Sequence, residues 1–175
     1  QFIINKLSRI QPYGQPIRND GPETHIIEKA GTPTMGGVLI ILSIFISGIL
    51  WSDLENVFIW TGLLTLLTFG LIGIADDYKK IKSNSSNGVK GITRIILQII
   101  FAVFISIIIL KILDDKINTT IAFPFFKNLI INLGWFFIPF SVFVIIGSSN
   151  AVNLTDGLDG LATVPVILVA ACFAF

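Results

Sequence analysis

Charged residues are scarce in this chain of 175 residues. Only 13% of the residues are Asp, Glu, Lys or Arg, and 53% are hydrophobic, whereas a soluble domain usually carries about 25% charged residues. The basic residues do not form the stripe with interleaved aromatics that nucleic-acid-binding proteins show, so a nucleic-acid partner is not expected. A single cysteine, Cys172, has no internal disulfide partner and therefore indicates no redox compartment. The composition indicates a protein whose solvent is lipid.

Long apolar runs are abundant instead. We expect an all-α fold, a polytopic integral membrane protein with a single membrane domain over residues 1–175. The runs predict four complete transmembrane helices and the start of another, at about 35–51, 57–75, 92–113, 129–147 and 161–175. The last run is shorter than the roughly 20 residues that a span requires. Because the chain also begins with Gln1 rather than Met, we expect it to be a segment of a longer protein.

Basic residues are unevenly distributed among the loops. Most of the 12 lie in or beside the loops 5–34 and 76–91, which the positive-inside rule therefore places in the cytoplasm. Alternation carries the loop 148–160 to the same side, although it has no basic residue of its own. Residues 52–56 are few enough to predict a tight turn, and aromatics near Pro124 suggest an interfacial turn over 114–128.

Two adjacent carboxylates, Asp76 and Asp77, follow the second apolar run directly. They are either a helix end wetted by lipid headgroups or a pair placed there for chemistry. Carboxylates at a helix C-terminus oppose the helix macrodipole, so a compensating cation is expected. Lys79 and Lys80 are candidates, and Mg²⁺, which is usually held by one or two carboxylates together with phosphate oxygens, is another. The pair alone leaves both interpretations open.

The segment "NAVNLTDGLDGLA", residues 150–162, is polar without a basic partner. Its amides and carboxylates recur every third residue, at Asn150, Asn153, Asp156 and Asp159. Two glycines in the segment would let the backbone bend and bring more of these side chains to one site. Such groups suit a uracil, a ribose or a metal-bound water, and the residues do not choose among them. A plain connecting loop is the alternative.

The segment "GTPTMGG", residues 31–37, predicts the start of a helix with Thr34 as its N-cap. Helix N-termini attract phosphate, and Lys29 just ahead could reach the same anion. An ordinary capped helix preceded by a solvated lysine explains these residues equally. The only histidine, His25, is better explained as a solvated or structural residue than as a catalytic one.

Four strings resemble motifs of the phospho-N-acetylmuramoyl-pentapeptide transferases, within the superfamily of polyprenyl-phosphate sugar-phosphate transferases. They are "RNDGPETH", "GTPTMGG", "DDYKK" and "NAVNLTDGLDGLA". The resemblance covers nearly the whole chain. It implies transfer of phospho-N-acetylmuramoyl-pentapeptide from its UDP-linked precursor to undecaprenyl phosphate, with release of UMP and a need for Mg²⁺. It also implies a multi-pass protein of the bacterial cytoplasmic membrane, with a cytoplasmic active site and a homodimeric assembly.

The same resemblance implies roles for individual residues. Asp76 and Asp77 would lie at the catalytic centre, where one of them deprotonates or positions the lipid phosphate. The implied substrate-binding residues are Lys29, Thr34, Lys80, Lys90, Asn150, Asn153, Asp156 and Asp159. Of these, Lys29 and Asp156 would contact the uracil nucleoside. Asp76 and Asp77 are also candidate metal ligands, although the main metal-binding aspartate and a histidine-rich loop are expected beyond Phe175. Direct displacement and an aspartyl-phosphate intermediate both stay open.

Two alternatives are weighed against this interpretation. A sister transferase would move another UDP-N-acetylhexosamine 1-phosphate to the same kind of lipid. A transporter segment would use the aspartates to line an ion path, but carboxylates in transporters lie near the middle of the membrane. Here the sequence places them at helix ends on one face, which favours an enzyme.

Overall fold

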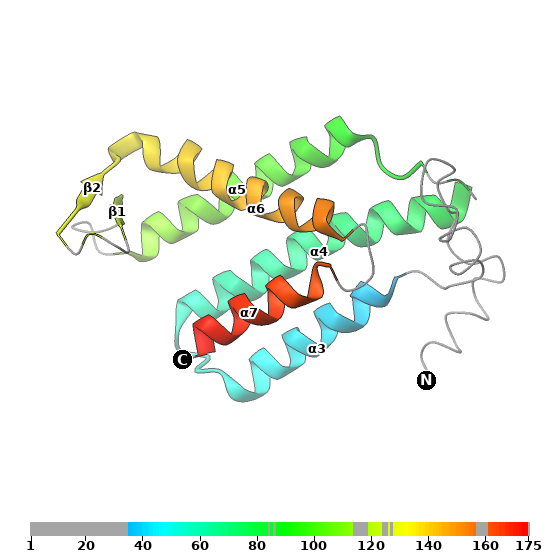
Figure 1. Ribbon diagram of the computed structural model, residues 1–175, viewed down its shortest axis with the longest axis horizontal. Helices are drawn as coiled ribbons and strands as arrows, with labels where there is room; N and C mark the ends of the chain where they lie inside the picture. The colour runs from blue at the N-terminus through cyan, green and yellow to red at the C-terminus, as the bar shows by residue number, and fades with distance from the viewer. Residues whose placement is uncertain are drawn as a thin grey trace. The chain divides into compact units, whose positions relative to one another are not determined.

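The computed structural model describes residues 35–83, 85, 87–113, 119–123, 126, 128–156 and 161–174. These residues are mainly helical, with one small two-stranded sheet (Figure 1). The elements are α3 (Gly36–Trp51), α4 (Val57–Ser83), α5 (Gly91–Ile112), β1 (Thr120–Ala122), β2 (Ile130–Asn132), the 3₁₀ helix η1 (Gly134–Phe136), α6 (Phe137–Thr155) and α7 (Thr163–Ala174).

Three stretches of helix in the described residues are long and apolar enough to cross a membrane: α4, α5, and η1 continued by α6. The prediction of an α-helical polytopic membrane protein is therefore confirmed, with the sheet as an addition. Contacts divide the chain into two units, Gln1–Phe101 and Ala102–Phe175, where the sequence predicts one membrane domain. The boundary falls inside α5, and each unit is described by itself below.

A tight turn joins α3 to α4, as the short connection predicts. The Asp53 carboxylate accepts a hydrogen bond from the backbone N–H of Glu55 at 3.1 Å. The Asn56 side-chain oxygen accepts one from the N–H of Phe58 at 2.9 Å, which satisfies a free donor at the start of α4. The turn is therefore held by its own side chains.

The two helices pack antiparallel through small residues. A Cβ at Gly48 in α3 would lie 3.0 Å from the Leu63 side chain in α4. A Cβ at Gly70, further along α4, would lie 2.5 Å from the end of Ile41, which is earlier in α3. The reversed order of these contacts shows the antiparallel arrangement, and the missing side chains allow the helices to approach closely.

Helix α4 continues well past the predicted end at residue 75. Hydropathy detects where the apolar run ends, but residues 76–83, which are mostly polar, remain helical. An ion pair one turn apart, between Asp76 and Lys80, supports this extension, and lysines in the last turn interact favourably with the helix dipole. Asp76 is thus two turns inside the helix, so the expected opposition between Asp76 and the macrodipole at a helix end was wrong.

The predicted helix at 129–147 was wrong at both ends. Residues Ile130–Asn132 form β2, which pairs antiparallel with β1 and places Ile131 opposite Ile121. An apolar run of β-branched residues fits a strand as well as a helix, so hydropathy could not separate the two. Gly134, with φ of 51°, follows the strand, and α6 then runs on to Thr155. The predicted loop at 148–160 is therefore helical up to Thr155. The segment 114–128, predicted as an interfacial turn, contains the strand β1.

The remaining boundaries lie close to prediction. Helix α5 differs by one residue at each end, and α7 lies within the predicted fifth run. Helix α3 begins one residue later than expected, because its N-cap is Met35 rather than Thr34. Met35 has φ of 71° and makes no side-chain capping bond.

Hydroxyl groups inside the apolar helices are satisfied locally. In α4 the hydroxyls of Thr61, Thr65 and Thr68 each donate to the carbonyl four residues earlier, at 3.0, 2.8 and 2.9 Å. In the second unit the hydroxyls of Ser106 in α5 and Ser141 in α6 lie 2.8 Å apart and join the two helices. These bonds spare the cost of bringing an unpaired hydroxyl into lipid.

Candidate functional site

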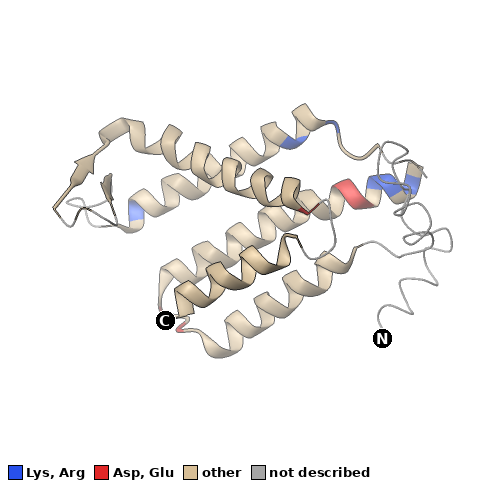
Figure 2. Cartoon of the chain, viewed as in Figure 1, with Lys and Arg blue, Asp and Glu red and all other residues tan. Residues whose placement is uncertain are grey.

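The charged side chains of α4 gather in its last two turns (Figure 2). Residues 57–75 contain no Asp, Glu, Lys or Arg and form a run about as long as a membrane core is thick. The first charges after that run are Asp76 and Asp77, and Lys79, Lys80 and Lys82 follow. Carboxylates and ammonium groups thus meet directly beyond the apolar part of the helix.

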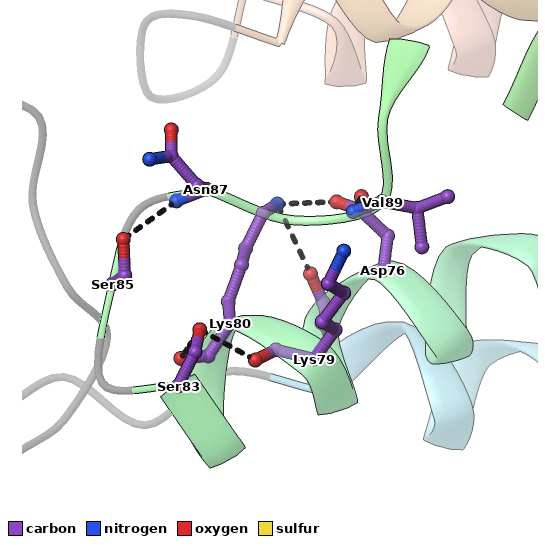
Figure 3. A network of polar contacts seen from close by, with 8 residues as sticks. Asp76, Lys79, Lys80, Ser83, Ser85, Asn87 and Val89 are labelled. Carbon is purple, nitrogen blue, oxygen red and sulfur yellow. Dashed lines mark hydrogen bonds and ion pairs between the residues drawn. The ribbon is translucent and has the colours of Figure 1, made fainter. Parts of the chain in front are cut away.

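The Asp76 carboxylate is bound on both of its oxygens (Figure 3). Its Oδ2 lies 2.6 Å from Nζ of Lys80, one helical turn later. Its Oδ1 accepts a hydrogen bond of 2.6 Å from the backbone N–H of Val89, in the connection between α4 and α5. Only 9% of Asp76 is exposed. These short, charge-assisted contacts fix the position of a buried carboxylate.

Positive groups surround the Asp76 carboxylate. The Lys80 ammonium and the Val89 N–H contact its oxygens, and Arg94 adds a further positive charge. The side-chain Nε of Arg94 is itself buried and has no hydrogen-bond partner in the described part of the chain. The carboxylate therefore lies in a positively charged surrounding.

The Asp77 side chain is more exposed than that of Asp76 and lies farther from Lys80. Its Oδ1 lies 3.5 Å from the same Lys80 ammonium, and 32% of its side chain is exposed, against 12% for Asp76. One lysine thus bridges both carboxylates, which reduces their mutual repulsion. Asp77 offers the better access to a ligand from solution.

A metal site made entirely by the described residues is not present. No cluster of three or more His, Cys, Asp or Glu side chains occurs within those ranges. The Asp76 and Asp77 pair supplies the two carboxylates that a magnesium ion bound partly by phosphate oxygens requires.

Gly88 and Val89 are site residues that the sequence analysis missed. They lie in the segment 76–91, which was predicted as a cytoplasmic loop. A Cβ on Gly88 would lie less than 3.0 Å from all three atoms of the Asp76 carboxyl group. The only signal in the sequence is a glycine three residues before the start of α5, which by itself indicates nothing specific.

The other predicted site residues lie elsewhere. Lys90 is exposed at the start of α5, and its carbonyl accepts the N–H of Arg94 at 3.0 Å. In the second unit, Asn150, Asn153 and Asp156 follow one another along the end of α6. Asn150 donates to the carbonyl of Ile146 at 2.9 Å, while Asn153 and Asp156 are exposed.

Three further predicted residues, Lys29, Thr34 and Asp159, lie outside the described residues. The sequence analysis places the loops 5–34, 76–91 and 148–160 on the same side of the membrane. That placement stays a prediction, because these loops belong to two separate units.

Comparison with known proteins gives two family matches. The model of Glycosyl transferase family 4 matches residues 59–175, and the phospho-N-acetylmuramoyl-pentapeptide-transferase signature 1 matches residues 29–41. The first match includes both carboxylates of α4 and the polar end of α6. The second includes Lys29, Thr34 and the beginning of α3.

Two bacterial relatives are similar over nearly the whole chain. A phospho-N-acetylmuramoyl-pentapeptide-transferase of Pelagibacter ubique is 62% identical over 160 residues, which are 91% of this chain and 44% of the relative. One of Rickettsia prowazekii is 52% identical over 173 residues, which are 99% of this chain and 47% of the relative. The chain spans about half the length of the curated relatives that it matches. Together with its apolar helices, these matches indicate a multi-pass bacterial membrane protein.

Proposed function

The chain belongs to Glycosyl transferase family 4, and from this premise we propose that it forms part of a phospho-N-acetylmuramoyl-pentapeptide transferase. The enzyme moves phospho-N-acetylmuramoyl-pentapeptide from UDP to undecaprenyl phosphate, releases UMP and makes the first lipid-linked intermediate of peptidoglycan synthesis. The observation that carries this proposal is the 62% and 52% identity to relatives that bear this name.

The proposed reaction is a phosphoryl transfer between two anions. An oxygen of the lipid phosphate bonds to the phosphorus that carries the sugar, and the bond from that phosphorus to the bridging oxygen breaks, so that UMP leaves. Several negative charges meet in this step, and the barrier is lowered mainly by groups that position and neutralise them. A site of carboxylates and lysines directly beyond an apolar helix suits one water-soluble and one lipid substrate.

The carboxylates and lysines of α4 take complementary parts in this proposal. One of Asp76 and Asp77 accepts the proton of the lipid phosphate or positions it. Lys80 and Lys90 neutralise phosphate charge. The remaining proposed substrate-binding residues are Lys29, Thr34, Asn150, Asn153, Asp156 and Asp159, of which Lys29 and Asp156 contact the uracil nucleoside.

The carboxylate pair fits magnesium. Mg²⁺ is usually held by one or two carboxylates and completes its shell with water and phosphate oxygens. Asp77, whose side chain is the more exposed, would hold the ion beside Asp76. When bound, the ion supplies positive charge that stabilises the developing charge on the phosphates.

The site would face the cytoplasm. The positive-inside rule supports this orientation, because most basic residues lie in the loops that carry the proposed site. The enzyme would lie in the bacterial cytoplasmic membrane as a homodimer, as the family resemblance implies.

A substrate comparison tests the proposed function. The full-length enzyme in detergent is expected to release UMP from UDP-N-acetylmuramoyl-pentapeptide at least about tenfold faster than UDP-N-acetylglucosamine is consumed, since a site that pairs buried polar groups with its substrate rejects analogues that lack them. UMP release is measured with undecaprenyl phosphate present, and a reaction without the lipid is the control. Faster consumption of UDP-N-acetylglucosamine would instead support the sister transferase.

Metal dependence is a separate prediction. After removal of divalent ions with a chelator, Mg²⁺ is expected to restore UMP release at least about tenfold better than Ca²⁺, because a site with few protein carboxylates suits the smaller ion, which keeps several waters. The rate is measured across a concentration series of each ion. Equal rescue by both ions would contradict a magnesium site of this kind.

A further inference from the structure

The Asp76 carboxylate is held by groups from two different segments. Lys80 comes from the same helix, one turn later, and contacts Oδ2. The Val89 N–H comes from 13 residues later in the chain and donates to Oδ1. A backbone donor cannot change its rotamer, so the second contact fixes where the carboxylate lies more strictly than a lysine can.

The Val89 contact depends on the residue before it. A Cβ at Gly88 would lie 2.6 Å from the Asp76 Cγ and 2.7 Å from Oδ2, and would be closer still to Oδ1. Real Cβ atoms do not approach other heavy atoms so closely, and moving the carboxylate aside would disturb its contacts with Lys80 and the Val89 N–H. Any side chain at position 88 would therefore displace the carboxylate or the backbone that holds it.

Other glycines nearby do not share this constraint. Gly73, one turn before Asp76, and Gly91, at the first position of α5, have no atoms within 4 Å of an added Cβ. The steric requirement is specific to position 88, and it concerns one side chain, that of Asp76.

We propose that Gly88 and the backbone N–H of Val89 form a positioning element for the Asp76 carboxylate in the transfer reaction. This inference rests on the proposed function, in which Asp76 takes part in catalysis. Gly88 lets the backbone reach the carboxylate, and Val89 donates to it. These two residues thereby set the geometry of a catalytic group without contacting the substrate themselves.

The test compares Gly88→Ala with the matched control Gly91→Ala in the full-length enzyme. Gly88→Ala is expected to lower kcat by about tenfold or more, because a small displacement of a catalytic group has a large cost. The KM for the UDP-linked substrate should change less than about twofold, since ground-state binding is retained. Gly91→Ala should leave both constants near those of the parent enzyme.

A second measurement asks whether the effect passes through Asp76. The thermal unfolding midpoint in detergent is recorded for Gly88→Ala alone and in an Asp76→Ala background. Gly88→Ala should lower the midpoint in the parent enzyme and leave it unchanged when Ala replaces Asp76, because the shorter side chain leaves room.

A proline pair covers the case in which Gly88→Ala does not fold. Val89→Pro replaces the N–H with a ring carbon, so it removes the donor and places that carbon against the Asp76 carboxylate, and it should lower kcat. Gly91→Pro is its control, because the first position of a helix tolerates proline.

The outcomes separate this inference from the proposed function. If Asp76→Ala is inactive while Gly88→Ala and Val89→Pro match their Gly91 controls, the positioning role is overturned and the catalytic role of Asp76 stands. If Gly88→Ala loses kcat but shows no coupling to position 76 in the unfolding midpoint, the positioning role is also overturned. If Asp76→Ala keeps normal turnover, the catalytic assignment itself fails, whatever the coupling.

Discussion

Asp76→Asn is expected to reduce the turnover of the full-length enzyme by about a thousandfold. The substitution keeps the size of the side chain but removes its charge. It also creates a local conflict, because both oxygens of Asp76 accept from donors, Lys80 and the Val89 N–H. An asparagine can accept through its oxygen on one side only and must turn an NH₂ donor toward the other.

Asp77→Asn is expected to reduce turnover as severely as Asp76→Asn, but without the accompanying loss of stability. The Asp77 side chain is more exposed than that of Asp76, so the removal of its charge should disturb the fold less. The thermal unfolding midpoint should therefore fall in Asp76→Asn and stay nearly constant in Asp77→Asn. UMP release in detergent with Mg²⁺ measures the activity of both.

Asp53→Asn is the matched control for these two variants. Asp53 is an exposed acid in the turn before α4, and its role is to accept the Glu55 N–H through one oxygen, which an asparagine can do equally well. Its turnover should equal that of the parent enzyme. Near-normal turnover in both Asp76→Asn and Asp77→Asn would show that the pair is a wetted part of a helix and has no catalytic role.

Hydropathy predicted the parts of the fold that depend on lipid. The tight turn of 52–56 and the bounds of α5 follow from where apolar runs begin and end, because unpaired backbone groups are costly in a bilayer. The end of α4 does not follow from the same signal. Residues 76–83 leave the apolar run but stay helical, since a helix ends where its capping and backbone require, and not where the solvent changes.

The hairpin before α6 was missed for a related reason. Ile130 and Ile131 extend the apolar run of α6 in the sequence, yet they pair as β2 with β1. A run of a few β-branched residues is compatible with a strand or a helix, and only the pairing partner decides between them. That partner, β1, lies in the segment predicted as an interfacial turn, so the hydropathy of residues 129–147 alone does not contain the answer.

The composition of the candidate site was more predictable than its geometry. The acidic pair and Lys80 stand out because charges next to an apolar run are rare. The Val89 donor is a backbone N–H, which every residue except proline has, so the residue type does not identify it. Gly88 matters only because the folded backbone passes close to the Asp76 carboxylate. Such contacts cannot be predicted from the sequence, because it does not show which backbone N–H groups are left free by the secondary structure or which carboxylates lie within reach of them.

Lys80→Met is expected to lower turnover by about a hundredfold. Methionine has nearly the length of lysine but no charge, so the substitution removes the ammonium that lies 2.6 Å from Asp76 and 3.5 Å from Asp77. Two adjacent carboxylates would then repel each other without a cation between them, and the more buried one would lose its main partner. The position of Asp76 would depend on the Val89 N–H and the charge of Arg94 alone. UMP release and the unfolding midpoint are both measured.

Two variants separate the bridging role of Lys80 from its charge. Lys80→Arg keeps a positive charge, but its planar, longer head cannot occupy the same point between two carboxylates, so an intermediate loss is expected. Lys79→Met removes a charge from the exposed neighbour, which makes no ion pair with either carboxylate in the part of the chain that the structure describes, and should act like the parent enzyme. Equal losses in Lys79→Met and Lys80→Met would mean that net positive charge near the membrane surface attracts the anionic substrates. A loss confined to Lys80 would instead require the contact with Asp76 and Asp77, since both lysines contribute the same charge to the same helix.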